Sequence, residues 1–114
     1  MLQAHIHFDV IGSAGLVTLD RPKALNALTA EMVTDLRQIL LGWRDDPAIS
    51  HVVIASSAPR AFCAGGDIRQ ARETILTSGF DEADAFFRGE YLVDLAIAEF
   101  GKPIIALCDG VVMG

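Results

Sequence analysis

The sequence has an excess of negative over positive charge and no long apolar run. Its formal net charge is −6, which argues against nucleic acid as a partner because that binding depends on neutralising phosphates. No apolar run approaches the ~18 residues needed to span a membrane, and the N-terminus lacks the features of a signal peptide. We therefore expect a soluble, cytoplasmic protein that binds neither nucleic acid nor membranes.

Cysteine and histidine are also scarce. Two cysteines, Cys63 and Cys108, are too few for a disulfide framework, and with three scattered histidines they show no zinc-ligand spacing. We therefore predict reduced thiols and no metal site. Cys63 is interpreted as a small buried residue because no histidine lies near it in sequence to activate the thiol. Cys108 ends an apolar run and is predicted to lie in the core.

The first half of the chain predicts a hairpin followed by a helix. Residues 6–10 alternate apolar and polar side chains, residues 12–15 form a turn, and residues 16–19 resume an apolar strand. This pattern indicates an antiparallel hairpin with a four- or five-residue loop. Thr29 is a predicted helix cap, and the apolar stripe that follows is typical of an amphipathic helix of roughly four turns.

Two continuous apolar runs, 52–55 and 104–108, predict buried parallel strands. The helix before the first of them favours a βαβ crossover. Two further helices are expected over 68–77 and 81–99, separated by Ser78 and Gly79. The predicted fold class is therefore α/β, and the length suits one domain.

The segment AFCAGGDIR, residues 61–69, contains the first candidate site. Gly65 and Gly66 allow backbone amides to approach a ligand, and a helix that starts near Asp67 places them at its positive end. Such amides can hold a phosphate or the oxyanion of an attacked carbonyl. A purely structural glycine turn remains the alternative. In the loop 20–28, Arg21 and Lys23 offer local positive charge for an anionic ligand, unless this loop is an ordinary polar connection.

Glu90 is the second candidate. It lies on the same predicted helix face as Phe86, Phe87 and Val93. Burial beside aromatic rings raises the pKa of a carboxyl and suits it to acid–base chemistry. A salt bridge with Arg88, or simple exposure, is the alternative.

Three segments, GLVTLDRPKALNAL, RAFCAGGDIR and KPIIALCDGVVMG, resemble in order and spacing the enoyl-CoA hydratase/isomerase (crotonase) superfamily. The resemblance covers residues 8–114. It implies a crotonase-like ββα spiral, of which residues 1–114 are expected to be the N-terminal part, ending within the second glycine motif. It also implies acyl-CoA thioester chemistry, with coenzyme A as part of the substrate and no separate cofactor.

The resemblance also implies roles for individual residues. In the family, two backbone amides bind the thioester oxygen: Gly66 supplies one, and Gly114 begins the turn that supplies the other. The segment Phe86–Tyr91 is similar to the 3-hydroxyisobutyryl-CoA hydrolases, in which a Glu at the position of Glu90 contacts the substrate, although Gly89 departs from their pattern. The implied CoA contacts are Lys23, Ala24, Leu25, Ala64, Asp67 and Ile68.

The resemblance thus implies hydrolysis of 3-hydroxyisobutyryl-CoA to 3-hydroxyisobutyrate and CoA in valine catabolism. The family's other acidic catalytic residues lie further along the chain, so we expect residues 1–114 to be inactive by themselves. Two alternatives remain open, an enoyl-CoA hydratase/isomerase and a non-catalytic module for CoA binding or oligomerisation. Acyl-chain specificity and oligomeric state, including a homo-oligomer, are left open.

Overall fold

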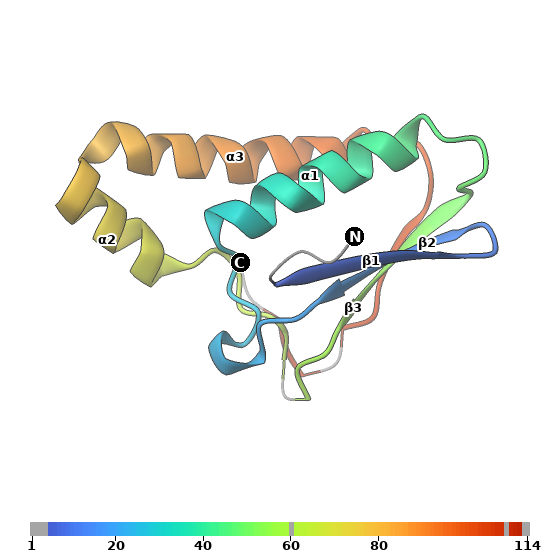
Figure 1. Cartoon of the computed structure of the whole chain (residues 1–114), viewed down its shortest axis with the longest axis horizontal. Helices are drawn as coiled ribbons and strands as arrows, with labels where there is room; N and C mark the ends of the chain where they lie inside the picture. Colours follow the sequence, from blue (N-terminus) through green and yellow to red (C-terminus); the bar gives the residue numbers. More distant parts are fainter. Residues whose placement is uncertain (1–4, 60, 109, 113–114) are drawn as a thin grey trace.

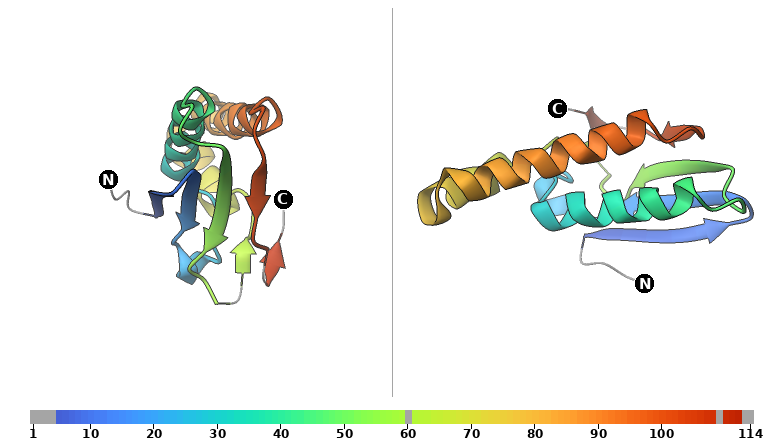
Figure 2. Two further views of the ribbon diagram at one scale, coloured as in Figure 1. Left: turned by 90° about the vertical axis from the view of Figure 1, so that its right-hand side faces the viewer. Right: turned by 90° about the horizontal axis from the view of Figure 1, so that it is seen from above.

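The computed structural model describes residues 5–59, 61–108 and 110–112. Helix α1 lies over a small sheet and α3 runs beside α1, as Figures 1 and 2 show. In chain order the elements are β1 (Ile6–Ile11), β2 (Ala14–Leu19), the 3₁₀ helix η1 (Pro22–Ala24), α1 (Ala30–Arg44), β3 (His51–Ser56), β4 (Ala61–Cys63), α2 (Ile68–Ser78), α3 (Phe80–Ala98), β5 (Ile104–Ala106) and β6 (Val111–Val112).

The sheet topology confirms the predicted α/β class. The larger sheet has the order β1-β2-β3-β5, and the smaller pairs β4 with β6. Strand β1 is antiparallel to β2, whereas β2 is parallel to β3 and β3 is parallel to β5. Helix α1 is therefore the crossover between two parallel strands, as predicted.

The β1–β2 loop is shorter than the predicted four or five residues. Ile11 pairs directly with Ala14, so only two residues form the turn, and Gly12 adopts a φ of 61°. Gly15 belongs to the strand, where an added Cβ would lie 2.5 Å from the ring of Trp43. This glycine makes room for the indole and plays no part in the turn.

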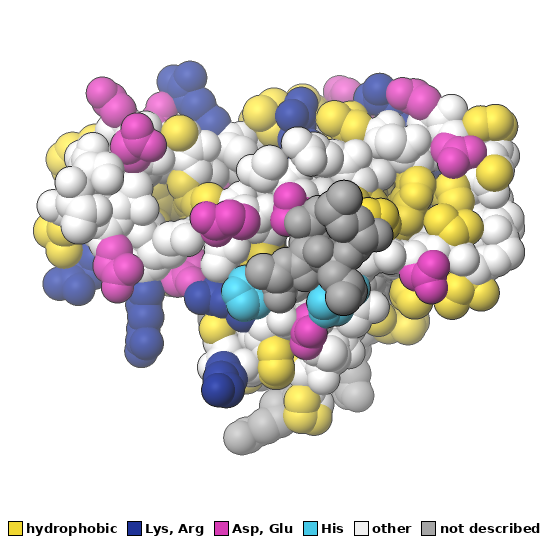
Figure 3. All heavy atoms as spheres, viewed as in Figure 1, with side chains coloured by type: hydrophobic (Ala, Val, Ile, Leu, Met, Phe, Trp, Pro, Cys, Tyr) yellow, Lys and Arg dark blue, Asp and Glu magenta, His cyan; other side chains and the backbone are white. Residues whose placement is uncertain are grey.

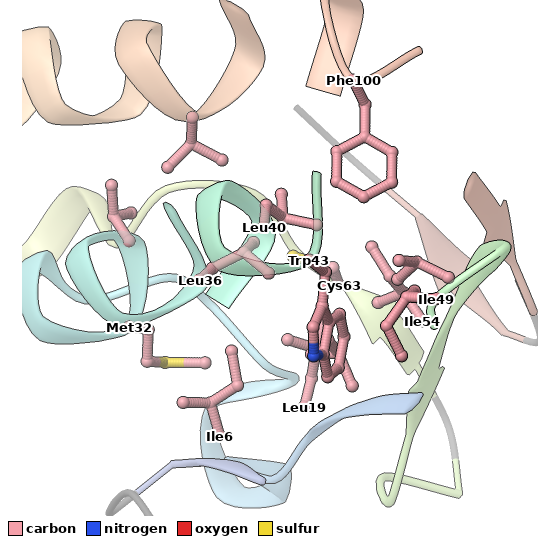
Figure 4. Close-up of a cluster of buried hydrophobic side chains, with 14 residues drawn as sticks. Ile6, Leu19, Met32, Leu36, Leu40, Trp43, Ile49, Ile54, Cys63 and Phe100 are labelled. Atoms are coloured by element: carbon pink, nitrogen blue, oxygen red, sulfur yellow. The ribbon is translucent and has the colours of Figure 1, made fainter. Parts of the chain in front are cut away.

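The core lies between α1 and the sheet. Thr29 caps α1, its hydroxyl accepting the Met32 N–H at 3.1 Å, and the predicted apolar stripe faces inward. Figure 4 shows these side chains meeting residues from β1, β2 and β3. The buried cluster is made of Ile6, Val17, Leu19, Met32, Val33, Leu36, Leu40, Trp43, Ile49, Val52, Ile54, Cys63, Val93 and Phe100.

Three predictions about burial were wrong. Strand β3 alternates buried with half-buried residues and is not buried on both faces. Strand β5 is parallel to β3 as predicted, but it spans three residues and Ile105 is 47% exposed. Cys108 is exposed and not in the core. Strand β5 is the outermost strand of its sheet, so these residues have no neighbouring strand on that side within the described chain.

Candidate active site

The Ala-Gly-Gly turn connects β4 to α2 and lies alongside the loop 21–28. Leu28 N–H donates to Gly65 O at 2.7 Å, and Asp67 N–H donates to Leu28 O at 2.9 Å. These two bonds form a parallel bridge between Leu28 and Gly66. Two segments predicted separately as ligand contacts are therefore joined as one surface.

Within the described residues, the Gly66 N–H is the amide of this turn that donates no hydrogen bond. Ala64 N–H donates to Leu25 O at 3.0 Å, and Gly65 N–H donates to the Cys63 thiol at 3.4 Å. No residue in the described part of the chain accepts a hydrogen bond from Gly66 N–H. Gly65 O and the Gly66 N–H belong to one trans peptide group and point in opposite directions, so the bond that Gly65 O accepts from Leu28 turns the Gly66 N–H away from the loop.

Two cavities share this turn as a wall. The first, of about 420 Å³, is lined by all six residues predicted to contact CoA. The second, of about 330 Å³, is lined by Gly66, Glu90 and the rings of Phe86 and Phe87. Four residues border both cavities: Ala64, Gly66, Asp67 and Ile68. The fold thus brings the predicted CoA contacts next to the predicted catalytic pair.

Glu90 lies directly against Gly66. A Cβ added to Gly66 would be 2.5 Å from Glu90 Oε1, so the absence of a side chain is what permits this approach. Burial first, and then the charge of Asp94, raise the pKa of the Glu90 carboxyl. The alternative salt bridge with Arg88 does not form, because Arg88 pairs with Asp84 at 2.8 Å. The prediction of a raised pKa at Glu90 is therefore matched, and its catalytic role stays a prediction.

The predicted pair of free cations needs correction. Arg21 Nη1 donates to Asp67 Oδ2 at 2.7 Å and to Ala27 O at 2.8 Å, so its charge is already paired. Lys23 is exposed and makes no salt bridge within the described residues. Arg69, which the sequence reasoning missed, lines the same cavity; its signal was a third cation immediately after the glycine turn.

Figure 3 shows Lys and Arg side chains gathered at the lower left of the molecule, over α2 and η1. The protein is acidic overall, but this region carries the positive charge that an anionic ligand requires. The local positive charge at this cavity therefore comes from Lys23, as predicted, and from Arg69 in place of Arg21.

Asp67 has a structural role in the turn. One carboxylate oxygen accepts the Gln70 N–H at 3.0 Å and caps α2, while the other accepts from Arg21. Burial by itself raises the pKa of Asp67, but these hydrogen bonds outweigh it and leave the pKa below its ordinary value. Asp67 lines the first cavity, yet both of its oxygens are already engaged.

The remaining candidates are settled or lie outside the described residues. Cys63 is buried, and burial raises the pKa of its thiol, which disfavours the reactive thiolate. Gly114 lies outside the described residues. The described part of the chain contains no group of three or more His, Cys, Asp or Glu that could hold a metal ion, and none of its helices is long and apolar enough to cross a membrane.

Comparison with known proteins places this geometry in context. Residues 14–114 match the family described as Enoyl-CoA hydratase/isomerase. The chain is 40% identical to a mitochondrial 3-hydroxyisobutyryl-CoA hydrolase of Danio rerio, over 97% of this chain and 29% of that protein. The structure superposes on an enoyl-CoA hydratase from Rhodobacter sphaeroides 2.4.1 with a TM-score of 0.88 and 41% identity, over 94% of this chain and 32% of that one.

A carnitinyl-CoA dehydratase from Mycobacterium thermoresistibile gives a TM-score of 0.91 at 36% identity, over 98% of this chain and 33% of that one. The names of all three proteins specify a CoA derivative. The chain spans about three tenths of the length of the Danio rerio relative.

Proposed function

This chain belongs to the enoyl-CoA hydratase/isomerase family, and from that premise we propose that the protein carrying it hydrolyses an acyl-CoA thioester. The substrate we propose is 3-hydroxyisobutyryl-CoA, and the products are 3-hydroxyisobutyrate and CoA, a reaction of valine catabolism. The name of the Danio rerio relative, at 40% identity, supports this choice of substrate.

The observation that carries the proposal is the Gly66 N–H, which has no acceptor in the described part of the chain and lies in the wall of the cavity lined by Glu90. When the oxygen of water attacks the thioester carbon, an electron pair moves onto the carbonyl oxygen. The Gly66 N–H stabilises that oxyanion, and one such donor contributes roughly 3–4 kcal/mol. Collapse of the intermediate then breaks the C–S bond, and CoA leaves as its thiol.

The residues around Gly66 have separate proposed roles in proton transfer and in CoA binding. Glu90, whose pKa burial raises, binds the substrate hydroxyl or transfers a proton during attack. Lys23, which makes no salt bridge within the described residues, and Arg69 both line the first cavity, where they meet the phosphates of CoA. We propose that the turn beginning at Gly114 supplies the second oxyanion donor.

The test is an assay of the protein as its gene encodes it, with 3-hydroxyisobutyryl-CoA and crotonyl-CoA as parallel substrates. We expect release of free thiol from the first and no loss of the double bond of the second. Hydration of crotonyl-CoA without thiol release would instead assign an enoyl-CoA hydratase, the second candidate, which the match to the Rhodobacter sphaeroides structure favours.

A further inference from the structure

Asn26 is a polar residue at the centre of the site whose role is still unassigned. Its side chain is fully buried, with 0% exposure. Its φ of 58° lies in the left-handed region, as does the φ of 51° at Leu25, and asparagine tolerates that conformation better than most side chains. A buried amide in a strained loop calls for partners on all of its polar atoms.

The Asn26 side chain joins three segments. Its Oδ1 accepts the Arg21 N–H at 2.7 Å, within the loop that borders the first cavity. Its Nδ2 donates to Ser56 Oγ at the end of β3, at 2.7 Å. The same Nδ2 donates to Phe62 O in β4, at 2.9 Å. One side chain thus ties the loop 21–28 to both strands beneath it.

A second connection runs from Asn26 into the glycine turn. Its backbone oxygen accepts the Cys63 thiol at 3.3 Å, and that sulfur in turn accepts the Gly65 N–H at 3.4 Å. Gly65 and Gly66 have no side chains that could hold their backbone in one conformation, and glycine has the widest conformational freedom of all residues. The position of the Gly66 N–H therefore depends on hydrogen bonds supplied by its neighbours.

We propose that Asn26 is a positioning residue: it holds β4 and the glycine turn so that the Gly66 N–H stands where the thioester oxygen must lie. The inference rests on the proposed function. Without the Nδ2 donor, β4 loses its hydrogen bond from Asn26 to Phe62 O, and its placement against the loop is less tightly fixed. A misplacement of about 1 Å at a reacting centre lowers the rate by roughly 100-fold.

The test compares Asn26→Asp with two matched variants in the protein as its gene encodes it. Asn26→Asp keeps the shape and the acceptor for Arg21 N–H but replaces the donor to Phe62 O. Lys102→Met loses two hydrogen bonds to backbone oxygens at the C-terminal end of α1. It is the control for a loss of stability that does not involve Asn26. Ser57→Ala removes an exposed hydrogen bond to Asp20, next to Ser56.

For Asn26→Asp we expect kcat to fall about 10- to 100-fold while KM changes less than about threefold. The amide resonance of Gly66 should move, and its hydrogen exchange should accelerate. Both controls should keep kcat and the Gly66 resonance at native values, even where the melting temperature falls. Native kcat and an unmoved Gly66 resonance in Asn26→Asp would overturn the proposal.

Two further outcomes are decisive. If Asn26→Asp does not fold, Asn26→Gly replaces it, because glycine fits a φ of 58°. Failure of both variants to fold would assign Asn26 a purely structural role and reject the proposal. Absence of thiol release by the native protein would reject the proposed function alone, since the Gly66 resonance requires no turnover.

Discussion

Replacing Gly66 by alanine should disable the site without unfolding the protein. An added Cβ would lie 2.5 Å from Oε1, 3.0 Å from Cδ and 3.1 Å from Oε2 of Glu90. All three atoms belong to the far end of one flexible side chain, so the carboxyl can move while the backbone stays in place. The Gly66 N–H itself is retained in the variant.

The size of the effect follows from the displacement. Ordinary contact with a Cβ begins at 3.4 Å, so Oε1 must retreat by roughly 0.9 Å from its present 2.5 Å. A misplacement of about 1 Å costs roughly 100-fold in rate, which corresponds to about 2.7 kcal/mol of transition-state free energy. The unfolding free energy should fall by less than about 1 kcal/mol, since a rotamer change of one side chain is enough.

Thiol release from the thioester and urea denaturation, measured on the same preparations, check both numbers. Gly42→Ala is the matched control: Gly42 lies within α1, and no heavy atom lies within 4 Å of a Cβ placed there. That variant should gain up to about 1 kcal/mol of stability, because alanine favours a helix over glycine, with native kcat.

A Gly66→Ala protein with native kcat would refute the reasoning. A double variant sharpens the test, because Glu90→Asp shortens the side chain that meets the new Cβ. If the clash is the cause, Gly66→Ala should cost clearly less in the Glu90→Asp background than in the native one, as residues in contact are not additive. Equal costs in both backgrounds would mean that Gly66 acts independently of Glu90.

Three further predictions concern charge and stability. Burial raises the Glu90 pKa above 4.5, so protonated Glu90 contributes stability below pH 4.5, and this contribution is lost as pH rises through the folded-state pKa. Glu90→Gln should therefore raise the melting temperature at pH 7 but not below pH 4.5. Lys102 Nζ donates to Trp43 O at 2.6 Å and to Asp46 O at 2.7 Å, so Lys102→Met should lower the unfolding free energy by about 1–2 kcal/mol in urea. Lys23→Ala should weaken CoA binding about two- to fivefold in calorimetry at low salt, with a smaller difference at high salt.

Local patterns predicted the elements well because each depends on neighbours in sequence. The stripe of α1 and its Thr29 cap have the expected helical spacing, and β1 to β3 were found from alternation and apolar runs. The hairpin loop was misjudged because Gly15 serves Trp43, a contact 28 residues away that leaves no local mark. Cys108 was misjudged because burial depends on which elements cover a strand, and its residue type does not settle that.

In the site, too, local features could be predicted from the sequence and contacts between distant residues could not. The glycine turn and the helix-face pattern pointed to Gly66 and Glu90, the resemblance implied the CoA contacts, and the fold brings these residues together. The Arg21–Asp67 pair spans 46 residues, and the bonds of Asn26 reach β3 and β4, so neither could be read from spacing. The substrate, the cytoplasmic location and a homo-oligomer stay predictions.

Gly66 shows why one residue type satisfies two demands at this position. The bridge with Leu28 engages Gly65 O and the Asp67 N–H. Because Gly65 O and the Gly66 N–H point in opposite directions from one trans peptide group, the Gly66 N–H faces away from the loop and has no acceptor among the described residues. The Cα of the same residue lies against the carboxyl of Glu90, so any side chain would separate the proposed oxyanion donor from the proposed proton-transfer group. The docking of the CoA-side loop therefore does two things at once: it builds the wall of the ligand cavity, and it frees the amide on which the proposed chemistry depends.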